Sequence, residues 1–494
     1  MGAKTGKEYI DRVDRANAEV WIDGERIQGK VSEHPAFKGV MKSQAELYDL
    51  QFAPDKKDYM LYKSPTTGDL VGAQFLQPRT KEELIQRRRF IQTWALHHNG
   101  MMGRSPDYVN AGIMAYGAAA EMFGKQDPKF KENMIKYYEY CRENDLSLTH
   151  TLIQPQVNRS VNSAQLPDPY IAARIVKTTS DGLIIRGARL LATQGGITDE
   201  LMVFPSTLVK QSEEENPYAF AFAIPNNTPG LKFICRETFD YNRSHFDHPL
   251  GSRYEEMDTI VVFNDVLVPW ERVFTYGDIN ICNQAYAESN AVVHMSHQVV
   301  AKNVIKTEFL LGILQLMVET INIGQYQHVH EKMAEVIIIL ETMKAFLHAA
   351  ESNAKIDRWG IMTPDFAPLN AARNWYPRIY PRFTEIIHLL GASGLVAIPS
   401  EKDFNSPLRS DLDKYLQAAN GDAYNRVKLY RLAWDVCMSA FGTRQTLYER
   451  FFFGDPVRMA GALYNGYDKQ PYVDRVKEFL ARSDEFAQNL QAKI

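Results

Sequence analysis

The residues best suited to chemistry lie in two short stretches of the chain. The first is Gly103-Arg104-Ser105-Pro106-Asp107-Tyr108, and the second, at 148–159, contains His150. Arginine suits an anion, a tyrosine hydroxyl suits a phenol or carbonyl oxygen, and histidine titrates near neutral pH. If Pro106 opens a helix, Arg104 and Tyr108 can point into one small volume. A structural arginine on a surface loop and a hydrogen-bonded crossing between domains remain as alternatives.

Composition narrows the class of protein. Of the 494 residues 45% are hydrophobic and 23% are charged, which is typical of a globular chain with a large core. The formal net charge of -4 argues against a protein that binds nucleic acid by neutralising phosphates. The start of the chain has no apolar signal core, and its apolar runs are too short to span a bilayer. The four cysteines have no metal-ligand spacing, so we expect a cytoplasmic protein with free thiols and no metal.

The elements that must position these residues fall into three parts. Residues 1–146 are predicted to form a mainly helical domain, with helices at about 80–98, 111–123 and 127–144. Residues 147–275 have strand character at 170–176, 182–190, 201–208, 218–224, 232–237 and 258–268. This alternation predicts an antiparallel β domain, either a barrel or a sandwich. Residues 276–494 form helices again at 290–326, 329–354, 370–390 and 413–450, long enough for a four-helix bundle and tail.

Two further groups of residues have alternative interpretations. The run Arg87-Arg88-Arg89 is most simply a solvated or interface face of its helix rather than a phosphate site. His294 and His297 are three residues apart on a predicted helix. They are a metal pair, flavin-site histidines or core residues with hydrogen-bond partners, and we favour the last.

Several separated motifs resemble one family. The order of helical, β and helical segments is similar to the acyl-CoA dehydrogenase architecture. Within that superfamily the two opening stretches, Ala192-Thr193, Pro205-Ser206-Thr207 and the run 448–456 look like the 4-hydroxyphenylacetate 3-monooxygenase family. The resemblance covers nearly the whole chain, and the motifs agree in order. It implies an α+β multidomain fold with a middle antiparallel β-barrel between two helical domains.

The resemblance also implies roles for individual residues. Arg104, Tyr108 and His150 match the positions that hold the ring hydroxyl of a phenolic substrate and act on it. Ser206 and Thr207 match the loop that meets the substrate's side chain. The positions matched to flavin contacts are His150, Thr151, Leu152, Gln156, Val157, Asn158, Arg159, Thr193, Phe453, Gly454, Asp455 and Pro456. Of these, Thr193 matches a hydroxyl near the reactive N5 of the flavin. The turn 453–456 serves its own or a neighbouring subunit.

The family's chemistry supplies the expected function. Such oxygenase components use FADH2 from a separate NAD(P)H:flavin reductase, and O2, to form a C4a-hydroperoxyflavin that ortho-hydroxylates a phenol to a catechol. No dinucleotide-binding fingerprint follows a strand in this chain, in keeping with a separate reductase. We therefore expect a homo-oligomer, as a tetramer, acting on 4-hydroxyphenylacetate or a related phenol, with no nucleic acid and no membrane as partner.

The sequence leaves four alternative functions to consider. A phenol or chlorophenol monooxygenase of the same family differs only in substrate. An acyl-CoA dehydrogenase needs a carboxylate base at the flavin, where the resemblance places Arg, Tyr and His instead. The related 4-hydroxybutyryl-CoA dehydratase needs cluster-binding cysteines, and the loop 103–108 has none. A flavin-free oligomer with the same fold is the remaining alternative.

Overall fold

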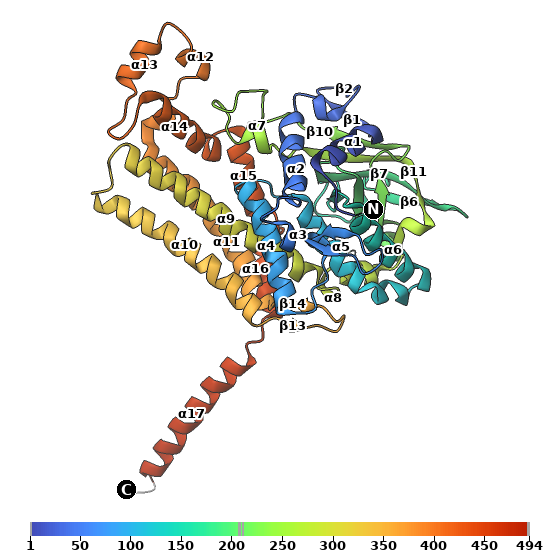
Figure 1. The fold of residues 1–494 in the computed structure, drawn as a ribbon. Coiled ribbons are helices and arrows are strands. Elements are labelled where there is room, and N and C mark those ends of the chain that lie inside the picture. Colours follow the sequence, from blue (N-terminus) through green and yellow to red (C-terminus); the bar gives the residue numbers. More distant parts are fainter. Residues whose placement is uncertain (1, 206–208, 210–211, 492–494) are drawn as a thin grey trace.

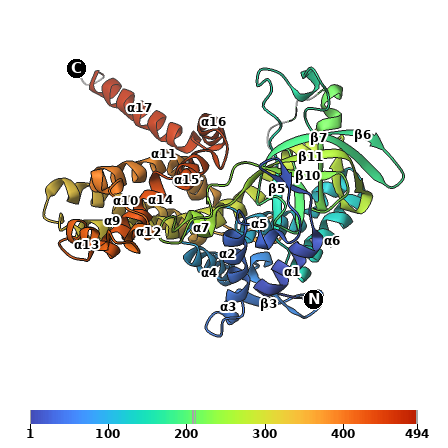
Figure 2. The same ribbon diagram turned by 90° about the horizontal axis from the view of Figure 1, so that it is seen from above.

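The computed structural model describes residues 2–205, 209 and 212–491, with side chains as far as residue 482. Helices from the two ends of the chain and a block of strands between them form three parts that pack side by side (Figure 1). Seen from above, the C-terminal helices lie to one side of the strands and the N-terminal helices lie beside both (Figure 2). The three parts follow the predicted order of helical, β and helical segments.

The N-terminal helices begin where the sequence has capping signals. α1 (Gly6–Ala16) follows a Thr5 capping box, and α4 (Lys81–His97) follows Thr80, whose hydroxyl accepts the Glu83 N–H. Proline occupies the first turn of α5 (Pro106–Ala118) and of α6 (Pro128–Asn144), where its missing N–H leaves no helical hydrogen bond unmade. α2 (Lys38–Leu50) and α3 (Lys57–Met60) complete this part. Two small strands, β3 (Leu61–Lys63) and β4 (Leu70–Gly72), pair with each other.

α5 is the central helix of the molecule. It packs against α9 of the C-terminal part on one side and contacts β5 of the middle part on another. Its residues from Pro106 to Tyr116 are all buried. Small residues make this close approach feasible, since a side-chain atom at Gly112 would already touch Met295. The helix therefore holds Tyr108 at the meeting point of the three parts.

The middle strands form two sheets. One has the order β2-β1-β10-β11-β7-β6 and the other β12-β9-β8-β5. The strands of the larger sheet are β1 (Val20–Ile22), β2 (Glu25–Arg26), β6 (Arg174–Thr178), β7 (Gly182–Thr193), β10 (Leu231–Cys235) and β11 (Asp258–Pro269). Those of the smaller sheet are β5 (Leu148–Thr151), β8 (Glu200–Val203), β9 (Phe220–Pro225) and β12 (Val273–Tyr276).

The prediction of a purely antiparallel unit is wrong for two pairs of strands. β1 runs parallel to β10, and β5 runs parallel to β8. β1 and β2 lie within residues 1–146, which were predicted as a mainly helical domain, yet they extend the larger sheet. Parallel pairs join strands through long crossovers, so local sequence patterns do not reveal them. No closed barrel is found among the described strands, and the barrel stays a prediction.

The C-terminal part is a bundle of long helices. α9 (Ala291–Thr320), α10 (Gln327–Ser352) and α11 (Phe366–Gly391) pack against one another, and α14 (Ala423–Cys437) and α15 (Ala440–Phe451) cover them. The single helix predicted at 413–450 is wrong. It is divided because Asp422 and Ser439 each accept a backbone N–H at the start of a new helix. Three shorter helices, α8 (Ile279–Glu288), α12 (Glu401–Phe404) and α13 (Arg409–Tyr415), lie around the bundle.

The end of the chain leaves the body of the molecule. After α16 (Pro456–Gly466), helix α17 (Gln470–Gln491) projects away from the body (Figure 1). Apolar side chains at Tyr472, Val473, Val476 and Leu480 are exposed along it. No helix among the described residues is long and apolar enough to cross a membrane.

All four cysteines are free. Cys141, Cys282 and Cys437 are buried, and Cys235 is half-buried. Burial raises the pKa of Cys235, Cys282 and Cys437 to about 12, and that of Cys141 well above its ordinary value. The thiols are therefore protonated at neutral pH.

Candidate functional site

Arg104 and Tyr108 meet at the start of α5. The Arg104 guanidinium carbon lies 4.4 Å from the centre of the Tyr108 ring and 4.2 Å from that of Phe452. Its Nη1 donates to the Tyr448 hydroxyl at 2.8 Å. A guanidinium has five N–H donors. Among the described residues, the Arg104 guanidinium donates only to the Tyr448 hydroxyl, so most of its donors are available to a ligand. Pro106 at the first helical position gives the predicted geometry.

His150 joins this pair from the middle part of the chain. It lies on β5, paired with Met202 of β8, and its ring centre is 5.7 Å from that of Tyr108. The neighbouring Thr149 and Thr151 point the other way and donate to carbonyls of β7. The alternation of the strand thus turns His150 toward α5. The three residues predicted to hold a phenol come together, although 42 positions separate Tyr108 from His150.

The surroundings set the protonation states of the site. Burial, with the adjacent Arg104 charge as a second cause, lowers the pKa of His150 to about 3. Burial raises the pKa of Tyr108 above its ordinary value, against the opposing effect of Arg104. At neutral pH the site therefore contains a cation, a neutral imidazole and a neutral phenol. Such a set can donate to, and accept from, a phenolic oxygen.

Aromatic rings from the end of α15 form a wall of the site. Phe452 lies 5.3 Å from Tyr108 and 4.8 Å from Tyr448, between ring centres. Phe453 contacts Phe452 at 4.4 Å and lies under the Arg373 guanidinium at 4.9 Å. The predicted turn 453–456 therefore adjoins the Arg104 site of its own chain. Asp455 ends this turn by accepting two N–H groups at the start of α16.

The remaining positions matched to flavin contacts differ in exposure, and Thr151 among them is fully buried. Leu152 is half-buried, while Gln156, Val157, Asn158 and Arg159 are exposed. Thr193, on β7, is close enough for its carbonyl to accept the Thr149 hydroxyl at 2.7 Å. Its own hydroxyl donates to Asp258 at 2.8 Å.

Residues in this area also carry unused hydrogen-bonding groups. Gln154 Oε1 and Arg373 Nε are buried and have no partner among the described residues. An acceptor and a cationic donor fit a flavin, which offers ring N–H groups and phosphates. The buried acceptor of Gln154 and the buried donor of Arg373 are therefore compatible with bound FAD.

The predicted side-chain loop is only partly described. Ser206 and Thr207 lie outside the described residues. The nearby Val209 is fixed to α8, since its N–H donates to Asn283 Oδ1 at 2.8 Å and its carbonyl accepts from Asn283 Nδ2 at 2.9 Å. Another α8 residue, Tyr286, is 39% exposed, but loss of solvent around its hydroxyl raises its pKa, with Tyr108 as a further cause. α8 thus brings Val209 and the Tyr108 region close to each other.

Five residues at the site were not found by sequence reasoning. They are Gln194, Glu256, Arg373, Tyr448 and Phe452. Each reaches Arg104, Tyr108 or Phe453 from an element far away in sequence, and none belongs to a spacing pattern. Two of them, Tyr448 and Phe452, lie in the run 448–456, whose resemblance to the family was noted without a role for either residue.

Of the two alternatives given for the arginine run, a solvated or an interface face, the solvated one is wrong for Arg87. Arg87 is 1% exposed, and its Nη1 lies 3.2 Å from His294 Nδ1. His297 Nε2 lies 2.9 Å from a Glu351 oxygen, and Arg88 also contacts Glu351. Both histidines thus have core partners, and the described residues contain no group of three metal-binding side chains. Arg87 is buried because α9 of the C-terminal bundle packs against α4. The charge of the arginine run could not predict this packing.

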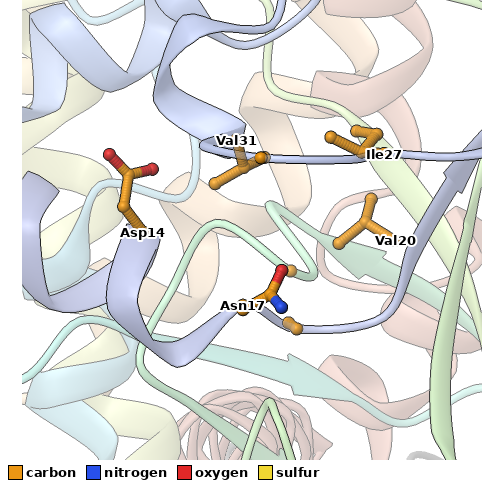
Figure 3. A pocket seen from close by; sticks show the side chains of 8 residues that line it. Asp14, Asn17, Val20, Ile27 and Val31 are labelled. Atoms are coloured by element: carbon orange, nitrogen blue, oxygen red, sulfur yellow. The ribbon is translucent and has the colours of Figure 1, made fainter.

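Two surface cavities lie away from this site. The one in Figure 3, between the end of α1 and β1, has a volume of about 10 Å³ and is lined by Asp14, Val20 and Val31. It has room for about one water molecule and none for an aromatic ring. A second, of about 210 Å³, lies over Trp21 and Ile234 on the larger sheet. Neither includes a residue of the Arg104 site.

Comparison with known proteins matches nearly the whole length of the chain. Residues 5–275 match the family model described as 4-hydroxyphenylacetate 3-hydroxylase N terminal, and residues 282–481 match the corresponding C-terminal model. The chain is 59% identical to the 4-hydroxyphenylacetate 3-monooxygenase oxygenase component of Geobacillus sp. (strain PA-9), covering 97% of each. It is 49% identical to that of Thermus thermophilus, covering 99% of this chain and 100% of the relative.

Solved structures give the same result. The oxygenase component of a 4-hydroxyphenylacetate 3-monooxygenase, complexed with FAD and 4-hydroxyphenylacetate, superposes with a TM-score of 0.93 at 50% identity, over 98% of this chain and 100% of that one. An archaeal 4-hydroxybutyryl-CoA dehydratase from N. maritimus superposes with a TM-score of 0.87 at 17% identity, over 97% of this chain and 95% of that one. The second likeness concerns the fold alone.

Proposed function

The chain belongs to the 4-hydroxyphenylacetate 3-hydroxylase family, and we propose that it is the oxygenase component of an FAD-dependent aromatic monooxygenase. It hydroxylates a phenol ortho to the ring oxygen and so forms a catechol, with O2 as co-substrate. The observation that carries the proposal is the meeting of Arg104, Tyr108 and His150 around one small volume.

Each of these three residues has a distinct task in the proposal. The Arg104 guanidinium neutralises charge on the substrate oxygen, which favours the phenolate and so enriches the ring carbon next to it in electrons. The Tyr108 hydroxyl stays protonated and donates a hydrogen bond to the same oxygen. His150 is neutral and can accept the phenolic proton. Its pKa rises when an anion is next to it, which makes that transfer easier.

FAD is held beside this volume by the turn 453–456, Thr193 and the segment 151–159. When bound in its reduced form, it supplies the electrons and the oxygen-activating ring. The exposed Arg159 offers charge to its phosphates, and Gln154 offers a buried acceptor. The Phe452 and Tyr108 rings keep water from the reacting atoms, which favours oxygen transfer over release of hydrogen peroxide.

Substrate choice depends on the loop with Ser206 and Thr207. We assign these hydroxyls to the substrate's side chain, where they suit a carboxylate such as that of 4-hydroxyphenylacetate. The Val209–Asn283 hydrogen bonds support this assignment because they hold Val209, two residues after Thr207, against α8. A phenol without an anionic group remains a possible substrate of the same site.

Reducing power comes from a separate flavin reductase. The name "oxygenase component" carried by the relatives supports a two-protein system. We further propose a cytoplasmic homotetramer in which the projecting α17 packs on another subunit, because its exposed apolar side chains have no cover in the monomer. The domain limits 1–146, 147–275 and 276–494, and closure of the middle strands into a barrel, belong to the same proposal.

Reconstitution tests the function. The protein is mixed with a flavin reductase, NADH, FAD and a panel of phenols that includes 4-hydroxyphenylacetate, phenol and 4-chlorophenol. Chromatography then identifies catechols, and peroxide is measured in parallel. We expect one phenol to give a catechol with little peroxide. No catechol from any phenol, together with reduction of a dye that depends on an acyl-CoA, would replace the proposal with an acyl-CoA dehydrogenase activity.

A further inference from the structure

Two side chains from distant parts of the chain grip the segment Gly103-Arg104. Glu256 lies in the link before β11, and one of its carboxylate oxygens accepts the Arg104 N–H at 2.6 Å. The other accepts the Gly103 N–H at 2.8 Å. Tyr448, on α15, accepts from Arg104 Nη1 at 2.8 Å and donates to the Gly103 carbonyl at 2.9 Å. Backbone and guanidinium are thus each held by a specific partner.

The Glu256 carboxyl group is itself held in place by neighbouring side chains. It is fully buried, and Gln194 Nε2 donates to it at 3.1 Å. The Arg444 guanidinium lies 3.7 Å away and is held by two hydrogen bonds of 2.7 Å to Asp258. Burial would raise the pKa of Asp258, but Arg444 and the other charges around it hold that pKa well below its ordinary value. Arg444 is therefore a cation held at a fixed place beside Glu256.

The Tyr448 ring is in tight contact with the same segment. A Cβ atom at Gly103 would lie 2.3 Å from Tyr448 Cζ, so only glycine leaves room for the ring. The hydroxyl then has both of its hydrogen bonds made within the Gly103-Arg104 segment. The guanidinium lies to one side of the Tyr108 and Phe452 rings and contacts both, which favours this orientation of the side chain.

We infer that Glu256 and Tyr448 are positioning residues that aim Arg104 at the oxygen of the phenolic substrate. The inference rests on the proposed function, because it takes Arg104 to be the group that meets this oxygen. Both residues act through Arg104: Glu256 fixes the backbone from which the side chain extends, and Tyr448 fixes the orientation of the guanidinium. Precise aim matters because oxygen transfer depends on the angle and distance of the ring.

The first test removes one hydroxyl. Tyr448→Phe keeps the ring and deletes both hydrogen bonds, and we expect the ratio of catechol to peroxide to fall about tenfold, the value of one lost hydrogen bond to a charged group. Tyr415→Phe, on the exposed α13, is the matched control and keeps the wild-type ratio. The affinity for reduced FAD, measured anaerobically by fluorescence, stays unchanged in both variants. A wild-type ratio in Tyr448→Phe overturns the inference.

The second test asks whether the effect passes through Arg104. Tyr448→Phe combined with Arg104→Ala should be no worse than Arg104→Ala alone, because the tyrosine then has nothing to aim. Glu256→Gln keeps the shape of the side chain. Combined with Arg104→Ala, it should lose less coupling than the sum of the two single losses. Fully additive losses mean that the two residues act independently of Arg104 and overturn the inference. If Arg104→Ala itself keeps wild-type coupling, the role given to Arg104 in the proposed function fails first.

A spectroscopic measurement distinguishes a misplaced Arg104 guanidinium from a general loss of stability. The phenolate of 4-nitrophenol absorbs visible light. The pKa of this bound probe can therefore be measured directly with the protein that carries oxidised FAD. We expect this pKa to be higher in Tyr448→Phe and Glu256→Gln than in the wild type, because a misplaced guanidinium stabilises the phenolate less. An unchanged pKa together with unchanged coupling would contradict the inference. Thermal unfolding of each variant identifies any general loss of structure.

Discussion

The charge on His150 decides what this residue can do for a substrate. Burial and the adjacent Arg104 lower its pKa to about 3, so the imidazole is neutral throughout the physiological range. A neutral ring can receive a proton, whereas an imidazolium could only donate one. The same cation that stabilises the substrate oxygen therefore keeps the acceptor available before the substrate arrives.

This state has a consequence for stability. Because the folded pKa lies below the ordinary value of 6.5, acid favours the unfolded chain, and stability is lost as pH falls below about 6.5. We expect His150→Asn to lose less stability than the wild type between pH 7 and pH 4.5, measured by urea unfolding. NMR of labelled histidine should show the His150 ring still neutral at pH 5. Titration of this ring between pH 6 and 7 would contradict the assignment.

At this scale the sequence predicted the residues that face the substrate but not those that hold them. Arg104, Tyr108 and His150 stood out because their chemistry is visible in their types and in recognisable motifs. Glu256 and Tyr448 did not, since a buried carboxylate that caps two N–H groups looks like any other glutamate in a sequence. Only the packing of β11 and α15 against the Arg104 segment reveals their role.

Among the elements, α15 packs so closely on the segment before α5 that this contact tolerates no added side-chain atom at Gly103. A methyl group at Gly103 would overlap the Tyr448 ring. We expect Gly103→Ala to lower the free energy of unfolding by about 1–3 kcal/mol and to uncouple oxygen transfer. In a double-mutant cycle, Tyr448→Ala should relieve part of this loss because it empties the space. Strict additivity in denaturant unfolding would mean that the ring does not limit this position.

A buried ion cluster fixes α15 to α9. Glu449 Oε1 accepts from Lys302 at 3.0 Å and from Lys306 at 2.8 Å, and all three side chains are almost fully buried. Burial would raise the pKa of Glu449, but the two lysines lower it to about 2. Its stabilising effect is therefore present above about pH 4.5 and is lost as pH falls toward 2.

Removing this carboxylate leaves two buried cations. We expect Glu449→Gln to lower the free energy of unfolding by about 3–5 kcal/mol at pH 7, measured in guanidinium chloride. Glu335→Gln, which removes a partner of the more exposed Arg382, is the control and should cost about 1 kcal/mol or less. The two variants should differ less as the solution becomes acidic. Equal losses at pH 7 would show that the cluster contributes no more than a surface pair.

Element positions were predicted better than their pairing. Capping signals such as Thr80 and Ser105-Pro106 marked helix starts that the structure confirms. The parallel pairs β1–β10 and β5–β8 were missed, because each joins segments more than forty residues apart. Arg87 shows the same limit, since its burial depends on the helices that cover α4.

For the whole molecule, the free-standing α17 makes a prediction about assembly. We expect a chain ending after Gly466 to form a smaller oligomer than the full chain, measured by light scattering during gel filtration. Loss of a stripe of exposed apolar side chains removes the contact that we assign to it. The double change Val473→Asp and Val476→Asp should have the same effect without shortening the chain. An unchanged mass in both would place the subunit contacts elsewhere.

The free thiols have a bearing on how long such a molecule survives its own work. A monooxygenase that uncouples produces hydrogen peroxide inside its own structure, and peroxide attacks the thiolate form of cysteine. With pKa values near 12 and mostly buried positions, Cys235, Cys282 and Cys437 present almost no thiolate at neutral pH. Burial, which elsewhere serves the packing of the core, here makes the sulfur atoms poor targets and protects the enzyme from the side product of its own reaction.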